Sequence, residues 1–311
     1  MPGAAPALKP QPAVITSAAT VAPMLGAARA GERLVAVGDY GIVLLSDDGG
    51  AKFRQAAAVP VSSTLTAVSF VDAKEGWAVG HWGAILHTAD GGEHWEIQRL
   101  SPEEDRPLFS VHFFDAQHGV AVGLWSLVLT TADGGKNWNP VTLPAPPEGG
   151  RGDRNLFKTF PGLHGELYVA AERGAVLKST DRGASWSYLN TGYKGSFWSG
   201  VTLADGTLLV GGLRGNIYRS ADGGKSWQAA ESGTHSSITD LQEIGGKVVG
   251  VALDGVQLES ADHGQHFTVS QRGDRLSLTA VQPGKNGTVR FSRRGVVIDS
   301  PAKAGPAPGK S

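Results

Sequence analysis

Six aspartates stand in a repeated eight-residue pattern, S/T-x-D-x-G-x-x-W/F, and are the first candidates for chemistry. A carboxylate two residues after a hydroxyl could bind a cation, act as an acid, or accept backbone N–H groups within its own turn. The pattern lacks the further acidic positions of a calcium-binding EF-hand loop. We therefore predict a structural, turn-capping role for Asp48, Asp90, Asp133, Asp181, Asp222 and Asp262.

A second set of candidates comes from aligning the turn that precedes each copy of this pattern. The residue before the turn glycine (Ser126 in the third copy) is Tyr40, Trp82, Trp125, Arg173, Arg214, Asp254 or Arg294. Arg293 stands one position earlier in the last copy, and three more arginines precede apolar runs: Arg106, Arg154 and Arg275. Arginine forks bind carboxylates in a bidentate way, and Trp and Tyr supply rigid apolar contact. These residues predict a face that binds a carboxylate-bearing chain with apolar side chains.

Each of these residues also has an ordinary structural interpretation. An arginine at a polar turn can be solvated or paired with a neighbouring carboxylate such as Glu172, and Trp82 and Trp125 can pack inward over a blade edge. The coincidence of three arginines at one repeat position favours the binding interpretation. The histidines are scattered and show no ligand spacing, so we expect no metal site and no cofactor.

The elements that position these residues follow from the repeat. We term each copy of the pattern a box; the boxes begin 40 to 48 residues apart, at Ser46, Thr88, Thr131, Ser179, Ser220 and Ser260. A turn and a short apolar run precede every box. The run SRRGVVIDS, which ends at Ser300, repeats this wording without a box after it. The chain therefore contains seven units.

Each unit has the pattern of four short strands. In the second unit, runs rich in Val, Ile and Trp lie at 65–71, 76–80, 84–88 and 95–100. Four strands in about 43 residues are typical of a propeller blade, and no segment sustains a helical period. We predict an all-β, seven-bladed β-propeller of four-stranded antiparallel blades. Its blades span about 19–60, 61–103, 104–146, 147–192, 193–232, 233–272 and 273–300.

The box should form the hairpin between the third and fourth strands. The glycine at its fifth position allows a positive φ, and the Trp or Phe at its eighth position should pack between blades. All box hairpins then lie on one face of the ring. The turns between second and third strands, and the crossings between blades, lie on the other face, where the candidate arginines and aromatics stand.

The ends of the chain bear on ring closure. The seventh unit has three predicted strands and no box, so we expect residues 13–16 to form the outer strand of the last blade. Residues 10–28 are uncharged and could suggest a signal peptide, but three prolines interrupt them, and the strand interpretation is favoured. We expect a single domain at 11–300, with disordered tails at 1–10 and 301–311.

Composition excludes several functional classes. The chain has 311 residues, 44 of them glycine, with a formal net charge of −1 and no cysteine. A thiolate nucleophile, a disulfide framework and a zinc ribbon are therefore excluded. A neutral chain has no field for nucleic acid or an acidic membrane surface. Because the chain is neutral, a basic face implies acidic residues elsewhere, such as the box aspartates on the opposite face.

The repeat resembles the Asp-box, or BNR, motif of sialidases, sortilin-type receptors and xyloglucan hydrolases. The wording VG-x-x-G-x-I-x-x-T-x-D-G-G-x-x-W, from Val79 to Trp95, is more closely similar to the photosystem II stability and assembly factor family. The resemblance implies a non-enzymatic, seven-bladed propeller with an arginine patch, which we match to Arg173, Arg214 and Arg294. It also implies an extracytoplasmic location, in the periplasm or thylakoid lumen, with the signal peptide absent from this chain.

The sequence is compatible with two functions. The first is a monomeric binding or assembly factor that holds a peptide or membrane-protein segment, without nucleic acid and without inserting into the membrane itself. The second is an Asp-box glycoside hydrolase or a glycan-binding propeller. Resemblance to sialidases would require an F/Y-R-I-P segment near the first blade, which is missing, and no pair of carboxylates is marked by the sequence. We therefore favour the binding function and expect no catalytic residue.

Overall fold

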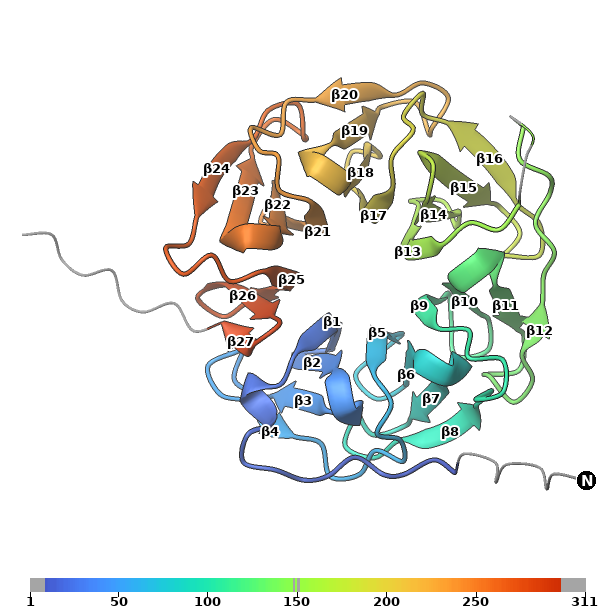
Figure 1. The fold of residues 1–311 in the computed structure, drawn as a ribbon, viewed down its shortest axis with the longest axis vertical. Coiled ribbons are helices and arrows are strands. Elements are labelled where there is room, and N and C mark those ends of the chain that lie inside the picture. Colours follow the sequence, from blue (N-terminus) through green and yellow to red (C-terminus); the bar gives the residue numbers. More distant parts are fainter. Residues whose placement is uncertain (1–8, 148, 150–151, 298–311) are drawn as a thin grey trace, which may run out of the picture.

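The computed structural model describes residues 9–147, 149 and 152–297. Seven antiparallel sheets surround a central axis, and the first strand of each sheet lies nearest that axis (Figure 1). Within the described residues, six sheets have four strands and the seventh has three. The predicted seven-bladed propeller is confirmed. No helix in the described part of the chain is long and apolar enough to span a bilayer.

The strands follow the repeat blade by blade. Blade one contains β1 Met24–Ala30, β2 Arg33–Gly38, β3 Val43–Ser46 and β4 Arg54–Gln55; blade two contains β5 Leu65–Phe70, β6 Gly76–Gly80, β7 Ile85–Thr88 and β8 Glu96–Arg99. Blade three contains β9 Leu108–Phe113, β10 Gly119–Gly123, β11 Val128–Thr131 and β12 Asn139–Pro140; blade four contains β13 Leu156–Pro161, β14 Leu167–Ala171, β15 Ala175–Ser179 and β16 Ser187–Asn190. Blade five contains β17 Phe197–Thr202, β18 Leu208–Gly212, β19 Ile217–Ser220 and β20 Gln228–Ala230; blade six contains β21 Ile238–Ile244, β22 Lys247–Ala252, β23 Val256–Ser260 and β24 Thr268–Gln271. Blade seven contains β25 Leu278–Gly284, β26 Gly287–Ser292 and β27 Gly295–Val297.

Short 3-10 turns are the only helical elements of the described residues. One, η1 Ala19–Val21, precedes blade one. The other five join second to third strands: η2 Asp39–Gly41, η3 His81–Gly83, η4 Leu124–Ser126, η5 Leu213–Gly215 and η6 Leu253–Gly255.

The hydrophobic core is divided among the junctions between blades. The box aromatic of each blade packs in a cluster shared with the preceding blade. Trp95 of blade two, for example, packs with Val35 and Leu45 of blade one. Each of the six box aromatics lies at such a junction: Phe53, Trp95, Trp138, Trp186, Trp227 and Phe267. The junction between blades six and seven has no box aromatic and is the smallest, with four buried residues among those described.

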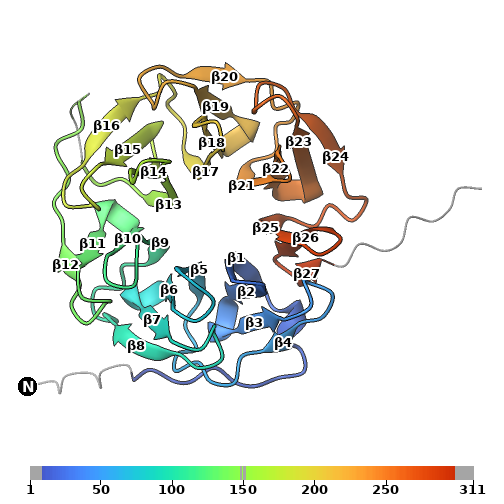
Figure 2. The same cartoon turned by 180° about the vertical axis from the view of Figure 1, so that it is seen from behind.

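The predicted closing strand is wrong. Residues 13–16 run along the outside of blade one, as both views of the ring show (Figures 1 and 2). The Ala13 N–H donates to the Val59 carbonyl oxygen, at 2.9 Å. The Gln55 side-chain amide accepts from the Thr16 N–H (3.0 Å) and donates to the Val14 carbonyl (2.9 Å). This amide supplies both a donor and an acceptor beside β4, so the segment is held there instead of on blade seven.

Side-chain contacts between blades seven and one close the ring. The Thr279 hydroxyl donates to the Met24 carbonyl at 2.6 Å, and the Gln282 amide donates to the Ala27 carbonyl at 2.9 Å. Phe53 and Phe291 meet edge to face, with ring centroids 5.7 Å apart. These contacts replace the backbone ladder that the sequence predicted.

The predicted tails lie mostly outside the described residues. This is the case for 1–8 and 301–311, and also for residues 298–300 at the end of the predicted seventh blade. Residues 9 and 10 form no regular element.

Candidate functional site

The turns and crossings meet on one face of the ring, as the repeat predicts. The first N–H of each turn between second and third strands donates to the carbonyl just before an inner strand. Examples are Asp39 to Pro23 at 3.0 Å and His81 to Thr64 at 2.9 Å. Equivalent bonds recur in the other blades. In blade seven, the Arg293 N–H donates to the Ser277 carbonyl. We term this side the turn face and the opposite side the box face.

The candidate position in the turn has the same backbone conformation in six blades. Its φ lies between 52° and 59°, in the left-handed region, at Tyr40, Trp82, Trp125, Arg173, Arg214 and Asp254. Such a conformation is uncommon for residues with a Cβ and costs about 1–3 kcal/mol where it occurs. Arg294 of blade seven does not share it. The shared conformation directs the six side chains similarly relative to their blades.

The aromatic candidates occupy blades one to three of the turn face. Tyr40 is 67% exposed and Trp125 is 56% exposed, so neither packs into the core. Trp82 is half-buried and lines a pocket of about 410 Å³ together with Tyr40.

Five arginines of the turn face are exposed and have no side-chain partner among the described residues. Within the described residues, no hydrogen bond or ion pair engages the guanidinium groups of Arg173, Arg214, Arg275, Arg293 and Arg294. They come from blades four, five and seven and from the crossing between blades six and seven. An exposed cation without a partner retains its full capacity to bind an incoming carboxylate.

Two of the predicted arginines do not belong to this exposed set. Arg154 is only 2% exposed, and its guanidinium lies over the Tyr188 ring, 5.3 Å from the centroid. Arg106 is half-buried and donates to the Trp125 carbonyl at 3.0 Å. Arg154 therefore forms the wall of a pocket, and Arg106 holds the turn of blade three.

The structure adds residues that the repeat alignment missed. A pocket of about 660 Å³ between blades four and five is lined by Arg154 and Arg173, and also by Tyr188, Tyr193 and Lys194. Burial raises the pKa of Tyr188 and Tyr193 and lowers that of Arg154. The TGYKGS crossing, with a tyrosine and a lysine next to an inner strand, is the signal in the sequence that could have identified them.

The mouth of the central channel is also aromatic. Phe109, Phe157 and Trp198 are the second residues of three inner strands and line a pocket of about 110 Å³. Deeper in the same pocket, Lys158 Nζ lies 3.4 Å from Asp240 Oδ1. Alternation along the strands places these side chains on the axis, but no repeat position marked them in the sequence.

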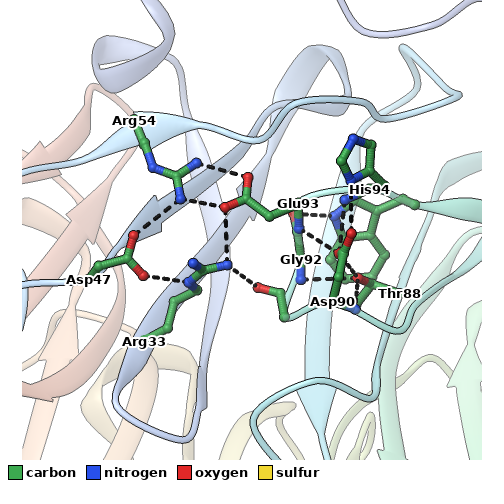
Figure 3. Close-up of polar contacts among 10 residues, drawn as sticks. Arg33, Asp47, Arg54, Thr88, Asp90, Gly92, Glu93 and His94 are labelled. Carbon is green, nitrogen blue, oxygen red and sulfur yellow. Dashed lines mark hydrogen bonds and ion pairs between the residues drawn. The ribbon is translucent and has the colours of Figure 1, made fainter.

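On the box face, every box aspartate caps its own hairpin. In blade two, the Thr88 hydroxyl donates to Asp90 Oδ1 at 2.9 Å and accepts from the Gly92 N–H at 3.0 Å. The same Asp90 oxygen accepts from the N–H groups of Glu93 and His94, at 3.0 Å each (Figure 3). The hydroxyl-to-aspartate bond recurs in all six boxes.

These hydrogen bonds favour the ionised carboxylate. They lower the pKa of Asp133 to about 2, with the Asn137 side chain as the largest cause. The pKa values of Asp222 and Asp262 are also lowered, mainly by side-chain hydrogen bonds from Ser226 and His266.

Two arginines of the box face are paired with carboxylates, unlike the five exposed arginines of the turn face. Arg33 and Arg54 of blade one meet Asp47 of the same blade and Glu93 of the blade-two box (Figure 3). The Arg54 guanidinium lowers the pKa of Glu93. This network joins two blades and leaves no arginine available. Among the described residues, no group of three or more His, Cys, Asp or Glu side chains could hold a metal ion.

A protein-family model matches this chain. The family model described as photosynthesis system II assembly factor YCF48 matches residues 48–199 and 104–296, which together cover most of the chain. The chain belongs to this family. No curated protein sequence matches the chain.

Solved structures show the same fold. A structure described as YCF48 bound to D1 peptide has a TM-score of 0.72 and 19% identity, covering 89% of this chain and 92% of that one. YCF48 from Cyanidioschyzon merolae has a TM-score of 0.69 and 18% identity, covering 89% of this chain and 94% of that one. At these identities the likeness shows the shared propeller architecture.

Proposed function

We propose that this chain is a non-enzymatic assembly-factor propeller that holds a peptide segment of a membrane-protein complex on its turn face. The observation that carries the proposal is the set of five exposed, unpaired arginines: Arg173, Arg214, Arg275, Arg293 and Arg294. Both arginines of the box-face network have carboxylate partners, so these five differ from them in their contacts and not only in residue type.

The chemistry of the turn face fits an acidic peptide with apolar side chains. Exposed guanidinium groups bind carboxylates in a bidentate way. The exposed Trp125 ring and the pocket lined by Tyr193 and Arg173 offer apolar contact on the same face. Loops on a rigid ring suit this task because the scaffold orders the binding groups in advance.

Family membership also supports a peptide-binding function. A family member of the same fold has been solved with a D1 peptide, which makes a peptide the favoured ligand class for this chain. By the same resemblance we propose an extracytoplasmic location, a monomeric state and a membrane-protein complex as the source of the peptide.

A hydrolase is not favoured by the carboxylates of the turns between second and third strands. Asp39, Glu172 and Asp254 come from blades one, four and six, so no two of them belong to adjacent blades. A glycosidase needs two carboxyl groups within about 10 Å of each other across the scissile bond. Glu172 is moreover occupied by the Asn155 amide, at 2.9 Å.

Charge reversal tests the binding face directly. We expect the triple variant Arg173→Glu, Arg214→Glu, Arg294→Glu to lose binding to arrayed short peptides in which acidic and apolar residues alternate. The reason is that each substitution replaces a carboxylate-binding cation with a repelling anion. The melting temperature should stay unchanged, because these side chains are exposed and form no hydrogen bond or ion pair with the described residues.

The matched control places the same charge change on the box face. Lys52→Glu, Lys136→Glu and Lys225→Glu alter three exposed lysines. Peptide binding should survive in this control. If the two triple variants lost binding equally, only net charge would matter, and the assignment to the turn face would be wrong. Turnover of fluorogenic sialosides by the wild-type chain would contradict the non-enzymatic proposal.

A further inference from the structure

The turn face carries a second, chemically opposite site at the junction of blades one and two. An open pocket of about 410 Å³ lies there, lined by Asp39, Tyr40, Ser62, Ser63, Thr64, His81 and Trp82. No arginine or lysine of the described residues lines it. Two large aromatic side chains and one carboxylate therefore border the same open space.

The walls of the pocket are fixed by backbone contacts. Tyr40 and Trp82 occupy the same turn position in adjacent blades, both with φ of 59°. The Trp82 carbonyl accepts from the Ser101 N–H at 2.7 Å. Both residues line the same open pocket.

The polar groups of the pocket are only partly used. Asp39 Oδ1 accepts from the Thr64 hydroxyl at 2.9 Å, and no described residue donates to its other oxygen. Ser63 is 8% exposed, and its hydroxyl has no hydrogen-bond partner in the described structure. This hydroxyl is covered from solvent, and the Asp39 carboxylate is the acidic group that lines the pocket.

We propose that this pocket binds the basic side chain, Lys or Arg, of the peptide held on the turn face. Aromatic rings attract cations through the negative potential of their faces, and the Asp39 carboxylate adds a formal charge of opposite sign. The source of the cation rests on the proposed function. The affinity of the pocket for an organic cation does not.

The proposal gives the bound peptide a direction. The pocket lies between blades one and two, and Arg214 belongs to blade five, across the ring (Figure 1). A peptide with a basic residue at one end and acidic residues at the other satisfies both sides at once. The reversed orientation would bring its acids to Asp39 and its base to the arginines, so charge repulsion disfavours it.

A pair of small probes tests the pocket apart from any peptide. N-acetyl-lysine methylamide and its uncharged counterpart N-acetyl-norleucine methylamide are titrated at constant ionic strength. The indole N–H signals of the tryptophans are followed by NMR, and the Trp82 signal is assigned by its loss in Trp82→Phe. We expect the Trp82 signal to move with the lysine probe and to stay in place with the norleucine probe.

Two variants separate the carboxylate from general surface charge. Asp39→Asn should weaken binding of the lysine probe about fivefold, because the carboxylate is lost and the rings remain. Asp254→Asn removes the same charge from blade six of the same face and should leave probe binding unchanged. Equal shifts with both probes, or none with the lysine probe, would overturn the proposal.

The outcomes also separate this site from the proposed function. If the arginine triple variant binds the lysine probe normally but no peptide, both proposals stand. If wild type binds the lysine probe but no acidic peptide, the cation pocket stands and the peptide function fails.

Discussion

A single aspartate in each box caps its hairpin by accepting several hydrogen bonds from it. In blade three, Asp133 Oδ1 accepts from the Thr131 hydroxyl at 2.8 Å and from the Asn137 N–H at 3.0 Å. These donors lower the pKa of the carboxyl group, so it stays ionised near neutral pH. The residue type that first suggests catalysis is therefore used for structure, and its repetition supplies one cap per blade.

This use of the carboxylate predicts acid sensitivity. The pKa of Asp133 is lowered from 3.8 to about 2 in the folded chain. The stabilisation from this ionised group is therefore complete above pH 4 and is lost as pH falls through about 2. We expect Asp133→Asn to lower the melting temperature at neutral pH, with the difference from wild type shrinking between about pH 4 and 2.

The control for this measurement is Glu103→Gln. Glu103 is exposed, and no described hydrogen bond engages its carboxylate. The difference in melting temperature between this variant and wild type should stay small and constant across the same pH range. Both melting temperatures are measured by circular dichroism. A difference for Asp133→Asn that did not change with pH would mean that the carboxylate charge contributes nothing to the hairpin.

At the scale of elements, the N-terminal segment is the part whose role changes most. Residues 13–16 sit beside β4, held by three hydrogen bonds that involve Val59 and Gln55. Val14 and Ile15 remain exposed. The segment buries little apolar surface, so it contributes much less stability than a strand inside a blade would.

We expect a chain that begins at Ser17 to remain folded. Each hydrogen bond contributes about 1 kcal/mol, and the ordering entropy of the segment offsets part of that. Urea unfolding should show a loss below about 2 kcal/mol. Met24→Ala is the comparison, because Met24 is fully buried in β1 and its truncation should cost about 2–5 kcal/mol. A truncation as costly as Met24→Ala would restore the closing-strand hypothesis.

At the scale of the whole molecule, the ring is a closed set of junctions of unequal strength. Box aromatics fill six of them, and the ring closes through the Phe53–Phe291 contact between blades one and seven. The junction of blades six and seven has only Val249, Val251, Leu278 and Val281 as buried residues among those described. Opening should begin where the least apolar surface is buried.

Hydrogen exchange measured by mass spectrometry tests this expectation. Amides of β25 and β26 should exchange faster than those of β5 and β6, which lie between two junctions that contain a box tryptophan. Equal protection in blades two and seven would mean that the side-chain bonds to Met24 and Ala27 compensate for the missing aromatic.

The binding proposals belong to this scale as well. The turn face combines unpaired arginines on blades four to seven with a cation-binding pocket at blades one and two. The exposed arginines alone, or the cation-binding pocket alone, would be a common kind of surface. Their positions on one rigid ring define the length and charge order of the ligand that fits.

The sequence by itself determined the number of blades, the strands within them, the two faces and the box hairpins. All of these depend on residues within one unit: the hydroxyl, aspartate and glycine of a box lie within five positions, and turn chemistry acts over that range. In the second unit, the expected runs match β5 to β8 to within one residue at each end. Interactions that are local and recur from unit to unit can therefore be predicted from the sequence.

Only the tertiary structure decided which candidate arginines are available and how the ring closes. Arg106 and Arg173 each follow an acidic residue, yet one is bound to the Trp125 carbonyl and the other is exposed without a partner among the described residues. Arg154 is buried over Tyr188, and residues 13–16 lie on blade one because Gln55 offers them both a donor and an acceptor. Each outcome depends on a partner about 20 to 40 residues away, brought close by the folding of the ring, and no local pattern encodes such a choice.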